Sequence, residues 1–408
     1  MNSSARICLI ALCLLLPRIG FSQSDTSDSS CEQHVAQWLD PASGEILDIE
    51  NVFERIEGTR IVLLGESHTV VAHHRWQHYM LAALHSRNAN IAVGFEMLPR
   101  RAQSVLDAWS AGQLTEDEFL EQSQWDKVWG YDADLYLPLL HFARLNRIPA
   151  LALNVDRALI SKVAQQGWDD IDEDQRLGLS DPAAASDAYR DSLAQLYAYK
   201  QTLRDQTEVE GEDKPDPPDV DEIKASEAFT HFVEAQLTWD RAMAEALAAA
   251  HRRDPSAMVV GIVGRGHLEY GYGIPHQLAD MGIEDVDVLL PLDSDNDCDP
   301  LPIDLASAVF VVDAENEQQV PARPRLGILI EDGDTGVRVM QVVDDSVAAA
   351  TGIRKGDVIQ AAAGFDTATT ADLIEVIQRQ ARGTWLPLKL LRDDKTIEMI
   401  AKFPQSFE

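Results

Sequence analysis

Residues 61–68 read Ile-Val-Leu-Leu-Gly-Glu-Ser-His, an apolar run of strand length that ends in charged and polar side chains. Apolar runs of similar length recur at residues 91–97, 149–154, 258–264 and 286–291. A strand that is apolar on both faces is typical of a parallel sheet that lies between layers of helices. The sequence therefore predicts an α/β fold in which helices flank a mostly parallel sheet.

The segments between these runs predict helices and two breaks in the domain. The predicted helices cover residues 70–88, 101–122, 133–147, 157–166, 184–206 and 225–252. Segment 203–224 is acidic and rich in proline, with few apolar side chains to bury, so we expect a flexible loop there. A second change in composition predicts a linker at 316–324. The α/β domain then spans residues 23–315, and a smaller domain spans 325–408.

The first residues have the pattern of a secretory signal peptide at 1–22. Arg6 precedes the apolar run 7–16, which is too short to span a membrane. The small residues that follow predict cleavage before Gln23. We therefore expect an exported protein, either periplasmic or secreted.

Cleavage would leave two cysteines, Cys31 and Cys298. In an oxidising compartment such a pair predicts a disulfide, with two free thiols as the alternative. The net charge of −34 repels phosphate backbones and anionic lipids, which argues against nucleic acid as a partner. No segment after the signal has the apolar length of a membrane-spanning helix.

Polar side chains stand at the ends of four of the predicted strands. Ligands of open parallel sheets collect at the carboxyl ends of the strands, so we expect these side chains to meet at one rim. They are Glu66, His68, Glu96, Asn154, Arg157, Arg265 and His267. Taken singly, Glu66 and Glu96 are also explained as carboxylates that cap the start of a helix.

Two carboxylates with two imidazoles are the groups that proton transfer or metal binding requires. The candidate catalytic residues are Glu66, His68, Glu96 and His267. His73 and His74, on the helix that follows, are further candidates for ligand binding. A divalent metal of unknown identity is compatible with this set of side chains.

Four ordered motifs resemble the ChaN-like haem-binding uptake proteins, a branch of the superfamily that also holds Tiki-type proteases and erythromycin-esterase-like hydrolases. The motifs are GESHTVVAHHRWQ, AVGFEMLPR, YLPLLHFARLNRIPALALNVDRALI and VGRGHLEYGYGIPHQL, within residues 45–295. The resemblance implies binding of haem or another small ligand, and an association with iron uptake. Haem iron is held by Tyr or His in some proteins, so Tyr270 and Tyr272 are further candidates.

The same resemblance leaves a hydrolase open, in which Glu66 and His68, with Glu96 and His267, activate water directly or through a bound metal. Whether the chain is an enzyme is not decided by the sequence. A haem also needs an apolar slot or a dimer interface, so a homodimer is one of the assemblies that we consider.

From Arg325 onward the sequence predicts a small β-rich unit that resembles the PDZ domains of bacterial periplasmic proteases. GIRKGDVI, at 352–359, is similar to a signature of these domains. The resemblance implies a groove that receives the C-terminus of a partner protein by β-augmentation. Its loop and edge strand would comprise Leu326, Gly327, Ile328 and Leu329, and its side-chain pocket would comprise Ile328, Ile330, Leu373 and Ile377.

Overall fold

The computed structural model describes residues 30–208, 219–298, 300–314, 324–333, 335–381, 383–393 and 395–404. The predicted signal peptide lies outside these ranges, as does all but the last residue of the predicted linker.

An eight-stranded sheet forms the centre of the N-terminal domain, with the strand order β2-β1-β8-β7-β3-β6-β4-β5. The strands from β5 to β8 along this order are parallel, and β1 and β2 form an antiparallel edge. Their bounds are β1 Trp38–Leu39, β2 Ile46–Leu47, β3 Ile61–Glu66, β4 Ile91–Pro99, β5 Ala150–Asn154, β6 Met258–Gly264, β7 Val286–Asp293 and β8 Ala308–Val312. The predicted α/β fold with a mostly parallel sheet is confirmed.

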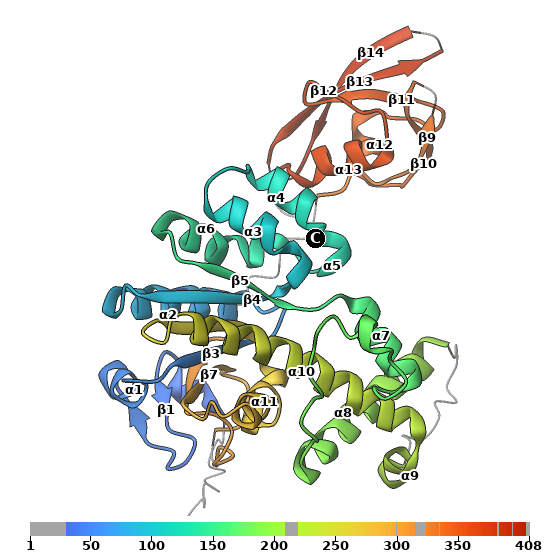
Figure 1. Cartoon of the computed structure of the whole chain (residues 1–408). Coiled ribbons are helices and arrows are strands. Elements are labelled where there is room, and N and C mark those ends of the chain that lie inside the picture. Colours follow the sequence, from blue (N-terminus) through green and yellow to red (C-terminus); the bar gives the residue numbers. More distant parts are fainter. Residues whose placement is uncertain are drawn as a thin grey trace, which may run out of the picture.

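Helices cover both faces of this sheet, which explains why most residues of its parallel strands are apolar. In β3, Val62 belongs to the same hydrophobic cluster as Met80 of α2. Its neighbour Leu63 points to the other face, into a cluster with Leu247 of α10. Figure 1 shows α2 and α10 as long helices that run along the sheet.

The structure divides one predicted helix of this domain and adds helices at 49–55, 125–128 and 274–280 that were not predicted. The bounds of the helices are α1 Ile49–Arg55, α2 Val71–Arg87, α3 Gln103–Ser110, α4 Glu116–Ser123, α5 Trp125–Val128, α6 Leu137–Asn146, α7 Arg157–Gln166, α8 Asp187–Glu208, α9 Val220–Ala225, α10 Glu227–Arg253 and α11 Ile274–Asp280. The predicted helix 101–122 is divided into α3 and α4, because Gly112 has a φ of +75° and Thr115 starts a new helix with a capping box.

The acidic segment 203–224 is helical at both ends, where α8 extends to Glu208 and α9 begins at Val220. Its centre, 209–218, lies outside the described residues. The two helices contact each other, and Ile223 of α9 is buried in a cluster with Leu193 and Phe229. Hydrophobic packing of this kind overrides the unfavourable local composition at the ends of the segment.

Cys31 and Cys298 form a disulfide, as predicted, with a Cα–Cα distance of 5.0 Å. The bond joins the start of the described chain to the loop after β7. Within the described ranges, no helix combines the length and apolar character that a membrane crossing requires.

The C-terminal domain, orange to red in Figure 1, is an antiparallel sheet of order β14-β13-β11-β10-β9, with β12 paired to β11. Its elements are β9 Ile328–Gly333, β10 Gly336–Val342, α12 Val347–Thr351, β11 Val358–Ala362, β12 Phe365–Asp366, α13 Thr370–Gln378, β13 Trp385–Arg392 and β14 Lys395–Lys402. Strand β9 is an edge strand, and α13 packs against it.

Candidate functional site

Glu66 and His68 form the first unit of the site. Glu66 is the last residue of β3 and is buried, and its Oε1 lies 2.6 Å from Nδ1 of His68. A carboxylate only accepts hydrogen bonds, so Nδ1 carries a proton, and in the neutral ring Nε2 carries the lone pair. No described residue forms a hydrogen bond with Nε2, and the His68 side chain is 28% exposed. This imidazole is therefore oriented, basic and open to a ligand.

Two buried rings support this first unit. Nε2 of His74 lies 3.9 Å from Oε2 of Glu66 and donates to the backbone oxygen of His68 over 3.3 Å. The hydroxyl of Tyr136 lies 3.4 Å from Oε1 of Glu66. Burial lowers the pKa of His74, which keeps its ring neutral. His74 is thus a support for Glu66 and is itself closed to solvent.

Glu96, His267 and Asp240 form the second unit. The backbone N–H of Gly264 donates to Oε2 of Glu96 over 2.6 Å, and Nε2 of His267 lies 3.6 Å from Oε1. Nδ1 of His267 lies 2.5 Å from Oδ1 of Asp240, a fully buried residue of α10. The hydroxyl of Tyr189 donates to the other oxygen of Asp240 over 2.9 Å. His267 is therefore held between two carboxylates.

The two units meet at Gly264, the last residue of β6. Together they form what we call the Glu/His centre. Gly264 pairs with Glu66 in the sheet, because β3 and β6 are neighbours. A Cβ atom at this position would come within 2.7 Å of Cε1 of His68 and 3.4 Å of Oε2 of Glu96. A larger residue would therefore push His68 away from the second unit.

The electrostatics of the centre favour protonated groups. Burial raises the pKa of Glu96, although the neighbouring imidazoles oppose this shift. Burial acts to lower the pKa of His267, but the charge and hydrogen bond of Asp240 outweigh it and raise the pKa. The pKa of His68 is raised in the same way by Glu66, again against burial. The imidazoles of His68 and His267 thus hold their protons more tightly than free histidine.

Two carboxylate oxygens in the centre have no hydrogen-bond donor among the described residues. They are Oε2 of Glu66 and Oε1 of Glu96, and both are buried. An unpaired buried acceptor costs about 1–3 kcal/mol, so such atoms point to a functional role. A proton or a donor group of a ligand would satisfy them.

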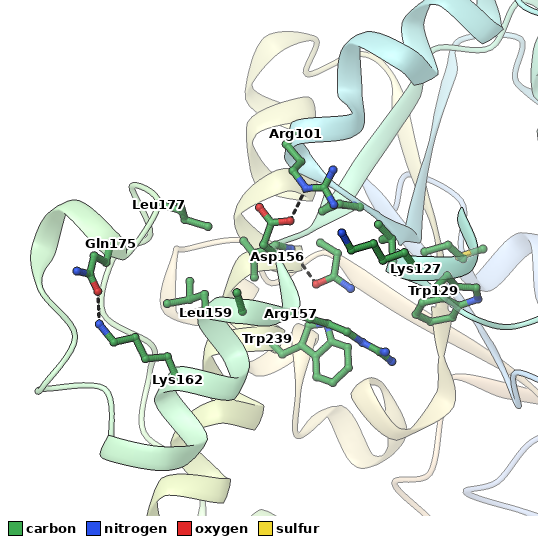
Figure 2. A pocket seen from close by; sticks show the side chains of 16 residues that line it. Arg101, Lys127, Trp129, Asp156, Arg157, Leu159, Lys162, Gln175, Leu177 and Trp239 are labelled. Atoms are coloured by element: carbon green, nitrogen blue, oxygen red, sulfur yellow. Dashed lines mark hydrogen bonds and ion pairs between the residues drawn. The ribbon is translucent and has the colours of Figure 1, made fainter. Parts of the chain in front are cut away.

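A pocket of about 530 Å³ opens next to the centre, and Figure 2 shows the side chains that line it. Met97, which follows Glu96, lies in its wall. So do Trp129, whose ring centroid is 4.8 Å from that of His68, and Trp239, which is 5.3 Å from His267. His68 and His267 therefore each contact one aromatic wall of the pocket. The volume is within the usual range for small-molecule and cofactor sites.

Asn154 and Arg157, both predicted for the rim, also line this pocket. The side-chain amide of Asn154 donates to the backbone oxygen of Glu96 over 2.9 Å. Its side-chain oxygen accepts from the N–H of Val155 over 2.8 Å, so this residue holds the ends of β4 and β5 together. Arg157 begins α7 and is exposed at the pocket.

Four other predicted residues, among them His73 and Arg265, contact partners outside the Glu/His centre. His73 is fully buried, and its ring bridges the N–H of Ser67 and Oδ1 of Asp293, each over 3.0 Å. Both of its nitrogens are thus engaged. Arg265 forms an ion pair with Glu269 over 2.5 Å.

Tyr270 and Tyr272 stack on each other, with ring centroids 5.2 Å apart. Tyr272 also packs on Tyr189, 5.6 Å away. Among the described residues, no contact joins either ring directly to Glu66 or Glu96. The structure therefore separates this pair from the centre, although both lie near the same strand end in sequence.

The predicted site did not include Asp240, Trp129 or Trp239. Asp240 had a usable signal, since it interrupts the apolar face of α10 between Leu237 and Ala244, which are both buried. The two tryptophans resemble core residues in the sequence, and only the fold shows that they reach the pocket. No group of three or more His, Cys, Asp or Glu side chains in the described ranges is arranged to hold a metal ion, so the suggested divalent metal has no support.

The C-terminal domain brings its predicted groove residues together. Leu326, Ile328, Ile330, Leu373 and Ile377 share one hydrophobic cluster, with Leu373 fully buried. Leu329 is 57% exposed because it lies on the opposite face of β9. Gly327 has a φ of +77°, and its carbonyl accepts from the N–H of Val343 over 2.8 Å, which fixes the loop before β9.

Comparison with known proteins matches both domains. Residues 52–278 match the family described as haem-binding uptake, Tiki superfamily, ChaN, and residues 324–402 match the PDZ domain family. No curated protein matches the chain. The solved structure titled cofacial heme binding to ChaN of Campylobacter jejuni is 19% identical, with a TM-score of 0.51 over 67% of this chain and 95% of that chain. At this identity the likeness concerns the fold.

Two further solved structures are more distant. The serine endoprotease from Yersinia pestis is 27% identical over 20% of this chain and 29% of that chain, with a TM-score of 0.19. A mutant of the erythromycin esterase EreC in its open conformation is 12% identical over 81% of this chain and 93% of that chain, with a TM-score of 0.37.

Proposed function

Because the chain belongs to the ChaN family of haem-binding uptake proteins in the Tiki superfamily, we propose that its N-terminal domain binds haem in the pocket beside the Glu/His centre. The observation that carries the proposal is this pocket, whose indole walls suit a planar apolar ligand. The proposed role is association with iron uptake, with haem as the cargo.

His68 is the iron ligand in this proposal. Its side chain is 28% exposed, whereas those of His267, His74 and His73 are 9%, 3% and 0% exposed. An imidazole whose Nδ1–H is held by a carboxylate, with Nε2 left open, is the usual arrangement of a metal-binding histidine. Trp129 contacts this ring and is itself part of the pocket wall, so we expect it to move when the ligand reaches His68.

A titration of the full-length protein with hemin tests the proposal. We expect a shift of the Soret band that saturates at micromolar hemin. An unchanged spectrum over this range would overturn it. A crystal structure with hemin would show whether a second copy of the chain helps to enclose the ligand.

A second candidate function is hydrolysis, and the unpaired oxygens of the centre favour it. In this candidate function His68, oriented by Glu66, would take a proton from water, and Glu96, whose pKa burial raises, would return one. A panel of ester and peptide substrates would test this function. Turnover that Glu66→Gln abolishes and His78→Gln leaves unchanged would support hydrolysis, and the absence of any turnover would count against it.

We also propose that the PDZ groove between β9 and α13 binds the C-termini of partner proteins that end in an apolar residue. The groove has a free strand edge and an apolar floor that includes Leu373. Fluorescence anisotropy with hydrophobic-ended peptides should detect binding. Amidation of the peptide C-terminus should weaken it about tenfold or more, since a charge-assisted hydrogen bond is lost; equal affinity for the amidated peptide would overturn the groove assignment.

Export is the last part of the proposed function, and the disulfide between Cys31 and Cys298 supports it. We expect the mature protein to begin at Gln23 and to show no alkylatable thiol before reduction. Intact mass with and without reductant tests both points. A full-length chain with reduced cysteines in the cytoplasm would contradict export.

A further inference from the structure

The pocket beside the centre gathers positive charge on a strongly acidic chain. The chain has 68 acidic and 34 basic residues, yet Arg101, Lys127, Arg157 and Lys162 all line this one pocket. The field of so acidic a protein repels anions in general. Local cations are therefore what would allow an anionic ligand to enter.

Two of these four cations are already engaged with neighbouring residues. Arg101 forms an ion pair with Asp156, and Lys162 donates to Gln175, and both contacts are drawn in Figure 2. The side chains of Lys127 and Arg157 form no hydrogen bond or ion pair with any other described residue. In Figure 2 they lie on the side of the pocket nearer to Trp129, away from Lys162 and Gln175.

Unpaired indole donors accompany these two cations. Nε1 of Trp129 and Nε1 of Trp239 are both buried and have no acceptor among the described residues. The Trp129 side chain is buried within the wall of the pocket. A buried donor without an acceptor is unusual in a folded protein, so these two indoles favour a ligand that carries hydrogen-bond acceptors.

We propose that Lys127 and Arg157 anchor the carboxylates of the ligand while Trp129 and Trp239 contact its planar body. The ligand class is therefore a flat, apolar molecule that carries two carboxylates. This inference rests on the proposed function, where the molecule is haem and the anchored groups are its two propionates. The pocket would then select its ligands by their carboxylates, whether or not the ligand contains iron.

Metal-free protoporphyrin IX and its dimethyl ester separate the contribution of the carboxylates from that of the planar ring, and neither contains iron. Both have the same planar ring, but only the first carries carboxylates. We expect the wild-type protein to bind the diacid about tenfold or more tightly than the diester, because charge-assisted hydrogen bonds are the stronger class. Fluorescence of the porphyrin gives both dissociation constants without any iron ligand.

Lys127→Met and Arg157→Met test the anchors. Each should weaken diacid binding about fivefold to tenfold and leave diester binding unchanged, so that the preference disappears in the double variant. Lys389→Met, an exposed position on β13, changes the net charge equally and is the control. Its preference should equal that of the wild type.

The outcomes distinguish the two proposals. Equal affinity of the wild type for diacid and diester, together with a hemin Soret shift, would overturn the anchors and leave haem binding in place. A preference that survives in the double variant would also overturn them. Failure of the wild type to bind hemin and both porphyrins would overturn both proposals.

Discussion

His68 and His267 stand at the ends of neighbouring strands and have the same local chemistry, but the fold places them in different surroundings. Each has Nδ1 against a carboxylate, at 2.6 Å from Glu66 and 2.5 Å from Asp240. The His68 ring is 28% exposed, whereas His267 is 9% exposed and lies against Trp239. Nδ1 of His267 is also 3.1 Å from the amide of Gln236.

This difference separates an accessible imidazole from an enclosed one. His68 keeps Nε2 open, so it is available to a ligand or a substrate. Nε2 of His267 faces Glu96 at 3.6 Å, so its charge serves to balance a buried carboxylate. We therefore propose that the same pairing of an imidazole with a carboxylate has two roles in this protein, and that burial of the imidazole decides between them.

The largest effect should come from breaking the buried pair. Asp240→Ala leaves His267 without its carboxylate and Tyr189 without its acceptor, and we expect a loss of about 3–5 kcal/mol in the free energy of unfolding. Glu66→Ala should cost less, because water can reach the His68 ring that it leaves behind. Urea unfolding followed by circular dichroism measures both variants. Equal losses would show that burial does not separate the two units.

For hemin binding we expect the opposite ranking of the two units: a change at His68 should matter more than a change at His267. His68→Ala removes the proposed iron ligand and should weaken hemin binding by about tenfold to a hundredfold, the scale seen for losses at metal sites. His267→Gln should change the affinity less than about threefold, because its ring is closed to the ligand. His78→Ala, on the same helix as His74, is the control. A larger loss for His267→Gln would contradict the assignment of His68.

Most of the fold was predictable because the strands are apolar on both faces. Most residues of the runs at β3, β4, β5, β6 and β7 fit this pattern, and neighbouring parallel strands necessarily end at one edge. The ends of segment 203–224 were not predictable in the same way, since their helices depend on contacts between α8, α9 and α10. Local composition contains no information on such contacts.

The site was predictable only where its residues follow strand ends. Glu66, His68, Glu96 and His267 have such positions, and the structure brings them together. Proximity in sequence was misleading for Tyr270, since the left-handed φ of +58° at this residue turns the chain after His267. Asp240 could not be joined to His267 without the packing of α10 on the sheet.

The smallest effect should be the pH dependence of stability, because titration removes a charge and leaves the side chain in place. The pKa of His267 in the folded protein is raised by Asp240, with burial opposing. Its stabilisation is therefore fully present below the unfolded value near pH 6.5 and is lost as the pH rises through the folded pKa. The pKa values of Glu96 and His68 are also raised, so these groups likewise make the free energy of unfolding fall as the pH rises. The contribution of Glu96 starts to be lost above about pH 4.5.

The free energy of unfolding of the wild type should therefore fall as the pH rises from 6 to 9. Asp240→Asn should flatten this decline more than Glu66→Gln, since His267 is the more buried of the two imidazoles. Asp293, whose pKa His73 lowers, titrates in acid and does not interfere in this range. If Glu66→Gln flattened the decline more, the exposed imidazole would be the more strongly coupled one, and burial would not be what distinguishes the two units.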